Sequence, residues 1–139
     1  MEEHQENTIR LPARIDNLEK LIDFALAALH RCGASGKIIS DFHLAMDEAC
    51  TNCVSYAYPE GQSGEIEIAC RNEPGEVKVI IRDWGRPYNP LKTPPPDLNL
   101  ALEDRPIGGL GVFLMHKFSD RLEYRREEGA NVLTIVKKL

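Results

Sequence analysis

The sequence predicts an α+β two-layer sandwich, in which a mostly antiparallel mixed sheet is covered by helices on one face. Segments of helical and of alternating hydrophobic periodicity follow one another in the order strand, two helices, two strands, loop, helix, two strands. Each consecutive pair of strands is joined by a short turn sequence, which is typical of antiparallel hairpins. The chain has 139 residues, so we expect one domain spanning 1–139.

The first part of the chain is mainly helical. Thr8–Leu11 is a candidate for a short strand, and apolar residues at helical spacing predict an amphipathic helix over Asp16–Cys32. A second helix follows, for which Ser40 and Asp41 are candidate early-turn or capping residues. Its apolar stripe is formed by Phe42, Ala45, Met46, Ala49, Cys53 and Ala57.

Two hairpins account for most of the remainder. Glu65–Cys70 and Val77–Asp83 alternate polar and apolar residues, and the turn sequence Asn72-Glu73-Pro74-Gly75 separates them. Arg121–Arg125 and Asn131–Lys137 predict a second hairpin at the end of the chain. Both pairs therefore add antiparallel strands to the sheet.

A proline-rich stretch without periodicity lies between the hairpins, and we expect residues 88–107 to form a lid loop. Loops of this length inside a compact domain are usually functional or mobile. Gly108-Gly109-Leu110-Gly111 follows and leads into a short helix over Val112–Phe118.

Composition excludes several classes of protein. The net charge of −5 argues against a general nucleic-acid binder, which needs a basic face. No apolar run approaches the roughly 18 residues of a membrane span. The acidic, polar start Met1–Asn7 is unlike a secretory signal, so we expect a cytoplasmic protein without direct nucleic-acid or membrane partners. The basic pair Lys137-Lys138 is expected to be solvated.

Cys50 and Cys53 form a Cys-x-x-Cys pair. This spacing occurs in redox pairs and in halves of zinc sites, but no second pair with metal-ligand spacing accompanies it. We expect buried or half-buried reduced thiols.

The second helix carries a polar pair on a surface otherwise patterned for burial. Glu48 and Asn52 are four residues apart and therefore project from one face. A carboxylate beside an amide oxygen suits a hard cation such as Mg²⁺ and leaves the carboxylate free to act as a base. The alternative is a solvated helix edge, since polar residues at this spacing are common.

Asp83-Trp84-Gly85-Arg86-Pro87 directly follows an apolar strand. The Asp83 carboxylate can accept a hydrogen bond from an exocyclic amine such as that of adenine, and Gly85 lets backbone approach a flat ring closely. Trp84 either packs near that ring or covers the turn. The alternative for the whole segment is a simple turn.

Glycines at the start of the last helix provide a third signal. Backbone N–H groups at a helix N-terminus lack partners and, together with the helix dipole, favour phosphates. Gly108, Gly109 and Gly111 are therefore candidates for a phosphate-binding turn, although the P-loop pattern is absent.

In order and spacing, these three segments match one family. Asp47–Asn52 resembles the N-box of the GHKL ATPases, the superfamily of gyrase, chaperone and histidine-kinase ATPases. Asp83–Pro87 and Gly108–Leu114 resemble its two glycine boxes. Within that superfamily the chain resembles the small stand-alone anti-sigma-factor serine/threonine kinases of bacteria. It departs from them at Tyr56-Ala57-Tyr58, where the family often has His-Ala-Tyr, and we expect a change in packing there.

The resemblance implies a role for each motif residue. Glu48 matches the catalytic general base, Asn52 the magnesium ligand and Asp83 the residue that recognises the adenine amine. The remaining nucleotide-binding residues are implied to be Gly85, Gly108, Gly109, Gly111 and Arg105. Of these, Arg105 lies where a lid arginine reaches the γ-phosphate or a partner protein.

The implied protein is an ATP- and Mg²⁺-dependent anti-sigma regulatory factor. It would phosphorylate a serine or threonine of an antagonist protein and sequester a sigma factor, and a homodimer is a further candidate assembly. The first alternative is a non-catalytic ATP-binding partner-switching module. The second is the catalytic half of a histidine kinase, which is disfavoured because no dimerising helix pair with a phospho-acceptor histidine is present.

Overall fold

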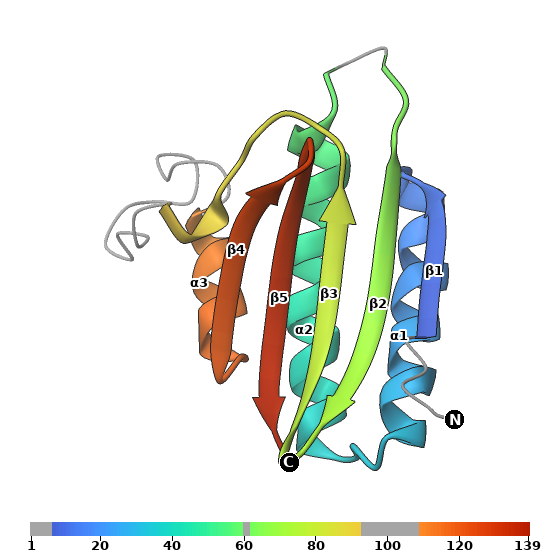
Figure 1. Ribbon diagram of the computed structural model, residues 1–139, viewed down its shortest axis with the longest axis vertical. Coiled ribbons are helices and arrows are strands. Elements are labelled where there is room, and N and C mark those ends of the chain that lie inside the picture. The colour runs from blue at the N-terminus through green and yellow to red at the C-terminus, as the bar shows by residue number, and fades with distance from the viewer. Residues whose placement is uncertain (1–6, 60–61, 93–108) are drawn as a thin grey trace.

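In the part of the chain that the structure describes, five strands form one antiparallel sheet and three α-helices cover one of its faces (Figure 1). The computed structural model describes residues 7–59, 62–92 and 109–139. The strands are β1 (Asn7–Pro12), β2 (Glu65–Glu73), β3 (Glu76–Asp83), β4 (Arg121–Glu127) and β5 (Ala130–Lys138). The helices are α1 (Leu18–Arg31), α2 (Lys37–Asn52) and α3 (Gly109–Lys117). The predicted fold class and both predicted hairpins are confirmed.

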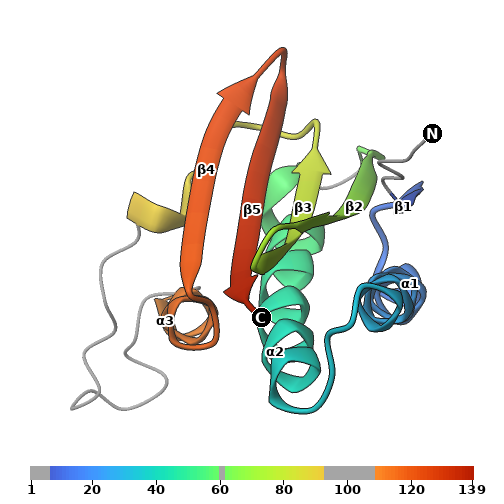
Figure 2. The same cartoon turned by 60° about the horizontal axis from the view of Figure 1, so that its bottom comes forward.

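The order of the strands across the sheet is β1-β2-β3-β5-β4, so β5 lies between β3 and β4. Its register places Asn131 opposite Asp83 and Lys137 opposite Val77. Because side chains alternate between the two faces of a strand, these four residues all lie on the face that the helices cover. Figure 2 shows α2 beneath β3 and β5, with α1 on the β1 side and α3 beside β4.

The hydrophobic core fills the space between the sheet and the helices. The inward residues of β2 and β3 are fully or almost fully buried and pack against the apolar faces of α1 and α2. Burying each large apolar side chain stabilises the fold by about 1.5–3 kcal/mol. The largest fully buried members include Leu21, Leu29, Phe42, Met46, Ile66, Ile68, Val77, Val79 and Ile81.

The opposite face of the sheet carries charged side chains in ion pairs. These are the polar residues that alternate with buried apolar residues along the strands. Arg10 pairs with Glu65 at 2.7 Å, and Lys78 pairs with Glu73 at 3.0 Å. Such pairs at the surface contribute about 0–1 kcal/mol each, so the fold depends mainly on the helix-covered face. Among the described helices, none is long and apolar enough to cross a membrane.

The second helix begins earlier than its predicted capping residues. α2 starts at Lys37, after Gly36, whose φ of 55° places it in the left-handed region that glycine adopts readily. Ser40 and Asp41 lie early in the helix, as predicted. The N-cap position is occupied by Gly36, which has no side chain that could form a capping hydrogen bond. After Asn52 the chain continues as a π-helical turn, Cys53–Ala57.

Lys137 corrects one prediction. It is buried, with 8% of its surface exposed, because it lies on the inward face of β5. Its Nζ donates to Asp41 Oδ2 of α2 at 2.7 Å, and Lys37 Nζ donates to the same oxygen at 2.7 Å. Burial alone raises the pKa of Asp41, but the two lysines outweigh burial and hold this pKa below its usual value. Lys138 is exposed, as expected.

We predict that Asp41→Asn lowers the free energy of unfolding by about 3 kcal/mol, because Lys137 is left buried without a counter-charge. The double variant Asp41→Leu/Lys137→Met should recover most of that loss, since it removes both charges. Lys37→Met is the control, because the Lys37 side chain is 83% exposed and its pairing should contribute less than about 1 kcal/mol. Urea unfolding measures all three variants.

The same ion pair predicts a pH dependence. The pKa of Asp41 is lower in the folded than in the unfolded chain, so its contribution is present above the unfolded pKa and is lost as pH falls through the folded pKa. The difference in unfolding free energy between the wild type and Asp41→Asn should therefore shrink in acid. A difference that stays constant down to the acid unfolding transition would contradict this role.

Candidate active site

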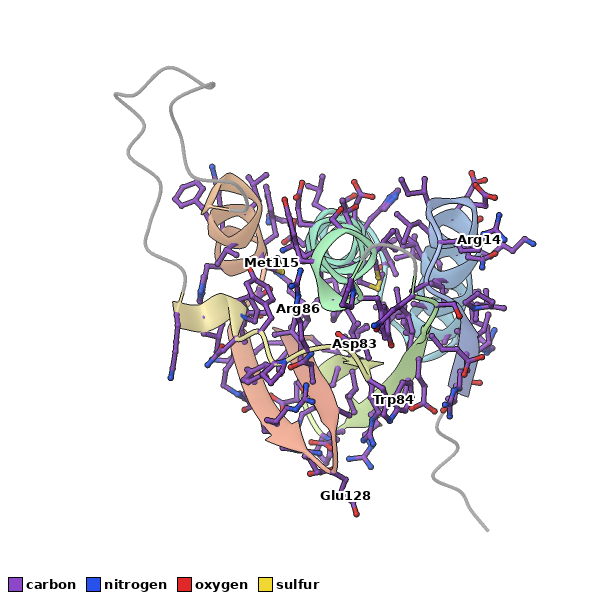
Figure 3. The ribbon with its side chains drawn as sticks, turned by 90° about the horizontal axis from the view of Figure 1, so that it is seen from above. Arg14, Asp83, Trp84, Arg86, Met115 and Glu128 are labelled. Atoms are coloured by element: carbon purple, nitrogen blue, oxygen red, sulfur yellow. The ribbon has the colours of Figure 1, made fainter. Side chains whose placement is uncertain are left out.

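A pocket of about 390 Å³, including its open side, lies at the end of α2, between that helix and the sheet. In Figure 3 Asp83 lies beneath the end of α2, and Met115 lies between α3 and α2. The lining residues come from five different elements and two connecting segments: Ala49, Asn52, Cys53, Ala57, Ile81, Asp83, Tyr88, Pro90, Met115, Tyr124, Asn131 and Leu133.

Asp83 is the buried carboxylate of this pocket, with 5% of its surface exposed. Its Oδ1 accepts hydrogen bonds from the Gly85 N–H and from Asn131 Nδ2, both at 2.9 Å. Its Oδ2 accepts a hydrogen bond from Cys53 Sγ at 3.3 Å. These bonds fix the rotation of the carboxylate and hold it at the last position of β3.

Gly85 packs against the π-helical turn. A Cβ at this position would lie 2.1 Å from the carbonyl oxygen of Ala57, which is a backbone atom. The next residue, Arg86, donates its N–H to the same carbonyl at 2.8 Å. The structure thus explains why this position is a glycine, in a way that the sequence analysis did not consider. The turn after β3 packs directly on the end of the α2 segment and leaves no room for a side chain.

Glu48 lies beside the first turn of α3. A Cβ added to Gly111 would lie 2.6 Å from Glu48 Oε2, so the absent side chain provides the space that the carboxylate occupies. Burial, and then the charge of Asp47, raise the pKa of Glu48 above its ordinary value. Glu48 is one helical turn from Asn52 but does not line the pocket itself.

Asn52 lines the pocket with an amide that has no internal partner. The residue is 9% exposed, and its Nδ2 is the one buried side-chain nitrogen or oxygen without a hydrogen bond among the described residues. A buried polar atom without a partner costs about 1–3 kcal/mol, and in a pocket it indicates that a polar ligand supplies the partner. The Asn52 amide offers donor hydrogens to phosphate oxygens and a carbonyl oxygen to a hard cation, so it fits both a triphosphate and Mg²⁺.

The glycine cluster is only partly described. Gly109 is the first residue of α3, and Gly111 lies in its first turn, as predicted for a helix that begins at the glycines. Gly108, Arg105 and most of the predicted lid lie outside the described residues. The described start of the lid includes Tyr88, which lines the pocket, and a 3₁₀ turn over Pro90–Lys92.

Asn131 is a site residue that the sequence analysis missed. It is 5% exposed, and its Nδ2 donates to Asp83 Oδ1 and to the carbonyl of Arg86, both at 2.9 Å. Its Oδ1 accepts from the Tyr88 N–H at 3.1 Å and from the Tyr124 hydroxyl. The available signal was a polar residue at an inward position of an otherwise apolar strand.

Tyr58 and Trp84 support the turn from outside the pocket. The Tyr58 hydroxyl accepts from the Trp84 N–H at 2.9 Å and donates to the carbonyl of Glu65 at 2.6 Å. The guanidinium of Arg10 lies 4.1 Å from the centre of the Trp84 ring. Of the two alternatives for Trp84, the structure supports packing on the turn, because the ring does not line the pocket.

The cysteines are free thiols, and Cys50 is buried while Cys53 is half-buried, as expected. Among the described residues, no group of three histidine, cysteine or acidic side chains is placed to hold a metal ion.

These motifs and this geometry define a nucleotide-binding ATPase fold. The chain belongs to the histidine kinase-like ATPase domain family, whose model matches residues 11–137. It is 30% identical over 138 residues to the serine-protein kinase RsbW of Bacillus mycoides, covering 96% of this chain and 85% of that protein. The serine/threonine-protein kinase BtrW of Bordetella bronchiseptica is 38% identical over 92 residues, which cover 66% of this chain and 65% of that relative.

A solved structure has the same fold. The crystal structure of the RsbU and RsbW domains of a Mycobacterium tuberculosis protein matches with a TM-score of 0.65 and 18% identity. The match covers 95% of this chain and 32% of that chain, so this chain corresponds to one part of the larger protein. The family assignment that the motifs predicted is confirmed.

We predict opposite effects of alanine at two glycines of the site. Gly111→Ala should keep or raise the melting temperature, because its Cβ meets only the flexible end of Glu48 and alanine favours a helix by up to about 1 kcal/mol. Gly85→Ala should destabilise by roughly 1–3 kcal/mol, because its Cβ meets the Ala57 backbone, which cannot move alone.

Gly111→Ala should also move the Glu48 carboxylate toward solvent. Its pKa should then fall toward the ordinary value, since burial is the main cause of its increase. Carboxyl titration by nuclear magnetic resonance measures this shift. A Glu48 pKa that is the same in Gly111→Ala and in the wild type would show that the glycine does not determine the position of the carboxylate.

Proposed function

We propose that this chain binds Mg²⁺-ATP and transfers the γ-phosphate to a serine or threonine of a partner protein. The observation that carries the proposal is the pocket in which the fixed carboxylate of Asp83 and the unpartnered amide of Asn52 lie together, with Glu48 beside α3. Relatives named serine-protein kinase and serine/threonine-protein kinase support the same reaction class.

Recognition of the base is assigned to Asp83. Its Oδ2 has an unused acceptor position, since a carboxylate oxygen accepts about two hydrogen bonds and Cys53 supplies one. An adenine amine can donate to it, whereas the carbonyl oxygen that guanine has at the same position would be repelled. Gly85 lies two residues after Asp83, and we propose that it lets the backbone of the turn approach the adenine ring closely.

The phosphates are assigned to the first turn of α3. Its N–H groups lack intrahelical partners, and the helix dipole favours negative charge there. In our proposal Gly108, Gly109 and Gly111 form this turn, Asn52 holds the metal ion, and Arg105 reaches the γ-phosphate. Mg²⁺, when bound, neutralises charge on the β- and γ-phosphates.

Glu48 is proposed as the general base. Its carboxylate lies beside Gly111, in the turn to which we assign the phosphates, and this position supports the role. There it takes the proton from the attacking serine hydroxyl, while the oxygen of that hydroxyl forms the new bond to the γ-phosphorus and ADP leaves. The raised pKa of Glu48 makes it a stronger base than an exposed carboxylate.

The partners are proposed from the resemblance to anti-sigma-factor kinases. The phosphorylated protein would be an antagonist, and the same chain would sequester a sigma factor, as a monomer or a homodimer, in the cytoplasm.

We further propose that residues 1–139 form a single domain with residues 88–107 as its lid. One buried apolar cluster has members in α1, α2, α3 and the sheet, and this shared core supports one domain.

Glu48→Gln should leave ATP affinity nearly unchanged and lower phosphoryl transfer by about 10²–10⁴-fold, the usual contribution of a positioned base. Asp47→Asn removes the neighbouring charge that raises the pKa of Glu48, so the acid limb of its pH–rate profile should move to lower pH. Transfer of labelled phosphate to a candidate antagonist measures both, with exposed Glu19→Gln as control. Wild-type transfer rates in Glu48→Gln would show that Glu48 is not the base. A wild type that binds ATP but transfers no phosphate to a partner would favour the non-catalytic binding module.

Asp83→Asn should weaken ATP binding by roughly 10- to 100-fold, since a hydrogen bond to a charged group contributes about 1.5–3 kcal/mol. Asn52→Ala should instead weaken binding mainly in the presence of Mg²⁺. Calorimetry with ATP and GTP measures both, and Asp23→Asn, an exposed carboxylate of α1, is the control. Equal affinity of the wild type for ATP and GTP would contradict the assignment of Asp83.

A further inference from the structure

The two oxygens of Asp83 have different surroundings. Oδ1 accepts two hydrogen bonds at 2.9 Å, from the Gly85 N–H and from Asn131 Nδ2, and both of its lone pairs are therefore in use. Oδ2 accepts one, from Cys53 Sγ at 3.3 Å. A ligand amine must therefore approach Oδ2, and the group beside that oxygen is the Cys53 thiol.

Cys53 lies at the wall of the pocket, where α2 ends and the π-helical turn begins. A π-helical turn inside a longer helix is frequent at functional sites. The residue before it, Asn52, has a buried amide without a partner in the same pocket, which independently indicates a polar ligand there. The thiol thus faces a ligand site and is held there by its bond to Asp83.

Cys53 is a free thiol, and its S–H donates to Asp83 Oδ2 at 3.3 Å. A protonated thiol is a weak donor, and its sulfur is a weak acceptor. Because S–H rotates about the Cβ–Sγ bond, it can donate to Asp83 Oδ2 or to an acceptor in the pocket.

Adenine presents such an acceptor next to its amine. On the Watson–Crick edge the exocyclic amine donates, and the adjacent ring nitrogen N1 accepts. With the amine on Asp83 Oδ2, N1 comes toward the group beside that oxygen. Hypoxanthine reverses both positions, since it has a carbonyl oxygen and an N1–H, and its N1–H would meet the S–H donor.

We propose that Cys53 is a second residue of the pocket that selects the base. Its thiol donates a hydrogen bond to N1 of the purine, while Asp83 accepts one from the exocyclic amine. The inference rests on the proposed binding of an adenine nucleotide and extends it to a residue that no motif assigned. Cys53 contacts the base in this proposal and takes no part in phosphoryl transfer.

The test compares ATP with inosine triphosphate, which differs from it at N1 and the exocyclic position. Cys53→Ala should weaken ATP binding by about 3- to 10-fold, the contribution of one hydrogen bond, and should leave inosine triphosphate binding unchanged, so the selectivity ratio falls. Cys53→Ser should keep the ratio, because a hydroxyl also donates. Cys32→Ala, a half-buried thiol at the end of α1 outside the pocket, should match the wild type.

Calorimetry with Mg²⁺ present gives the affinities of the wild type and the three variants for both nucleotides, and thermal melting without nucleotide checks that each variant is folded. Equal loss of both nucleotides in Cys53→Ala would overturn the proposal, because the thiol would then only shape the pocket. An unchanged ratio with unchanged affinities would overturn it as well. A wild type that binds neither nucleotide would instead contradict the proposed function itself, which separates the two failures.

Discussion

The ion pair between Asp41 and Lys137 fixes where α2 lies along β5, and the geometry of the pocket depends on that position. From Asp41 to Asn52 the helix advances about 17 Å, at about 1.5 Å per residue. From Lys137 back to Asn131 the strand advances about 20 Å. The two spans are nearly equal, so matching the charges at one end brings the last turn of α2 to Asn131 and Asp83 at the other.

At that other end, polar groups replace the apolar core. Between Lys137 at one end and the pair Asp83 and Asn131 at the other, the inward rows of β3 and β5 are apolar. Asp83 and Asn131 face each other in the sheet and are joined by a hydrogen bond. Asn131 also contacts the carbonyl of Arg86 and the N–H of Tyr88. One amide therefore holds the buried carboxylate, the turn after it and the start of the segment that leads to α3.

Local patterns predicted the elements, and contacts between distant residues explain what was missed. Hydrophobic periodicity and turn residues are properties of neighbouring residues, which is why the hairpins and helices were found. Lys137 looked like a solvated end because its partner, Asp41, is 96 positions away in the chain. The N-cap of α2 was not identified, because glycine at this position gives a weaker signal than a serine or an aspartate.

The same distinction separates the site residues. Glu48, Asn52 and Asp83 belong to contiguous motifs, and the structure brings the last two to one pocket, with Glu48 next to it. Asn131 and Cys53 belong to no such motif, and they reach Asp83 only through the sheet register and the helical turn. The alternation of β5 placed Asn131 inward, but its partners could not be read from one strand.

The position of β5 has a consequence for how the chain is made. This strand follows every other described element in the sequence, yet it lies inside the sheet between β3 and β4. During synthesis, β3 emerges from the ribosome with an open edge, and Asp41 emerges without Lys137. Because Asn131 also arrives with β5, the carboxylate of Asp83 acquires its fixed orientation only after β5 has been synthesised. The pocket at the end of α2 is therefore incomplete until β5 has been inserted between β3 and β4.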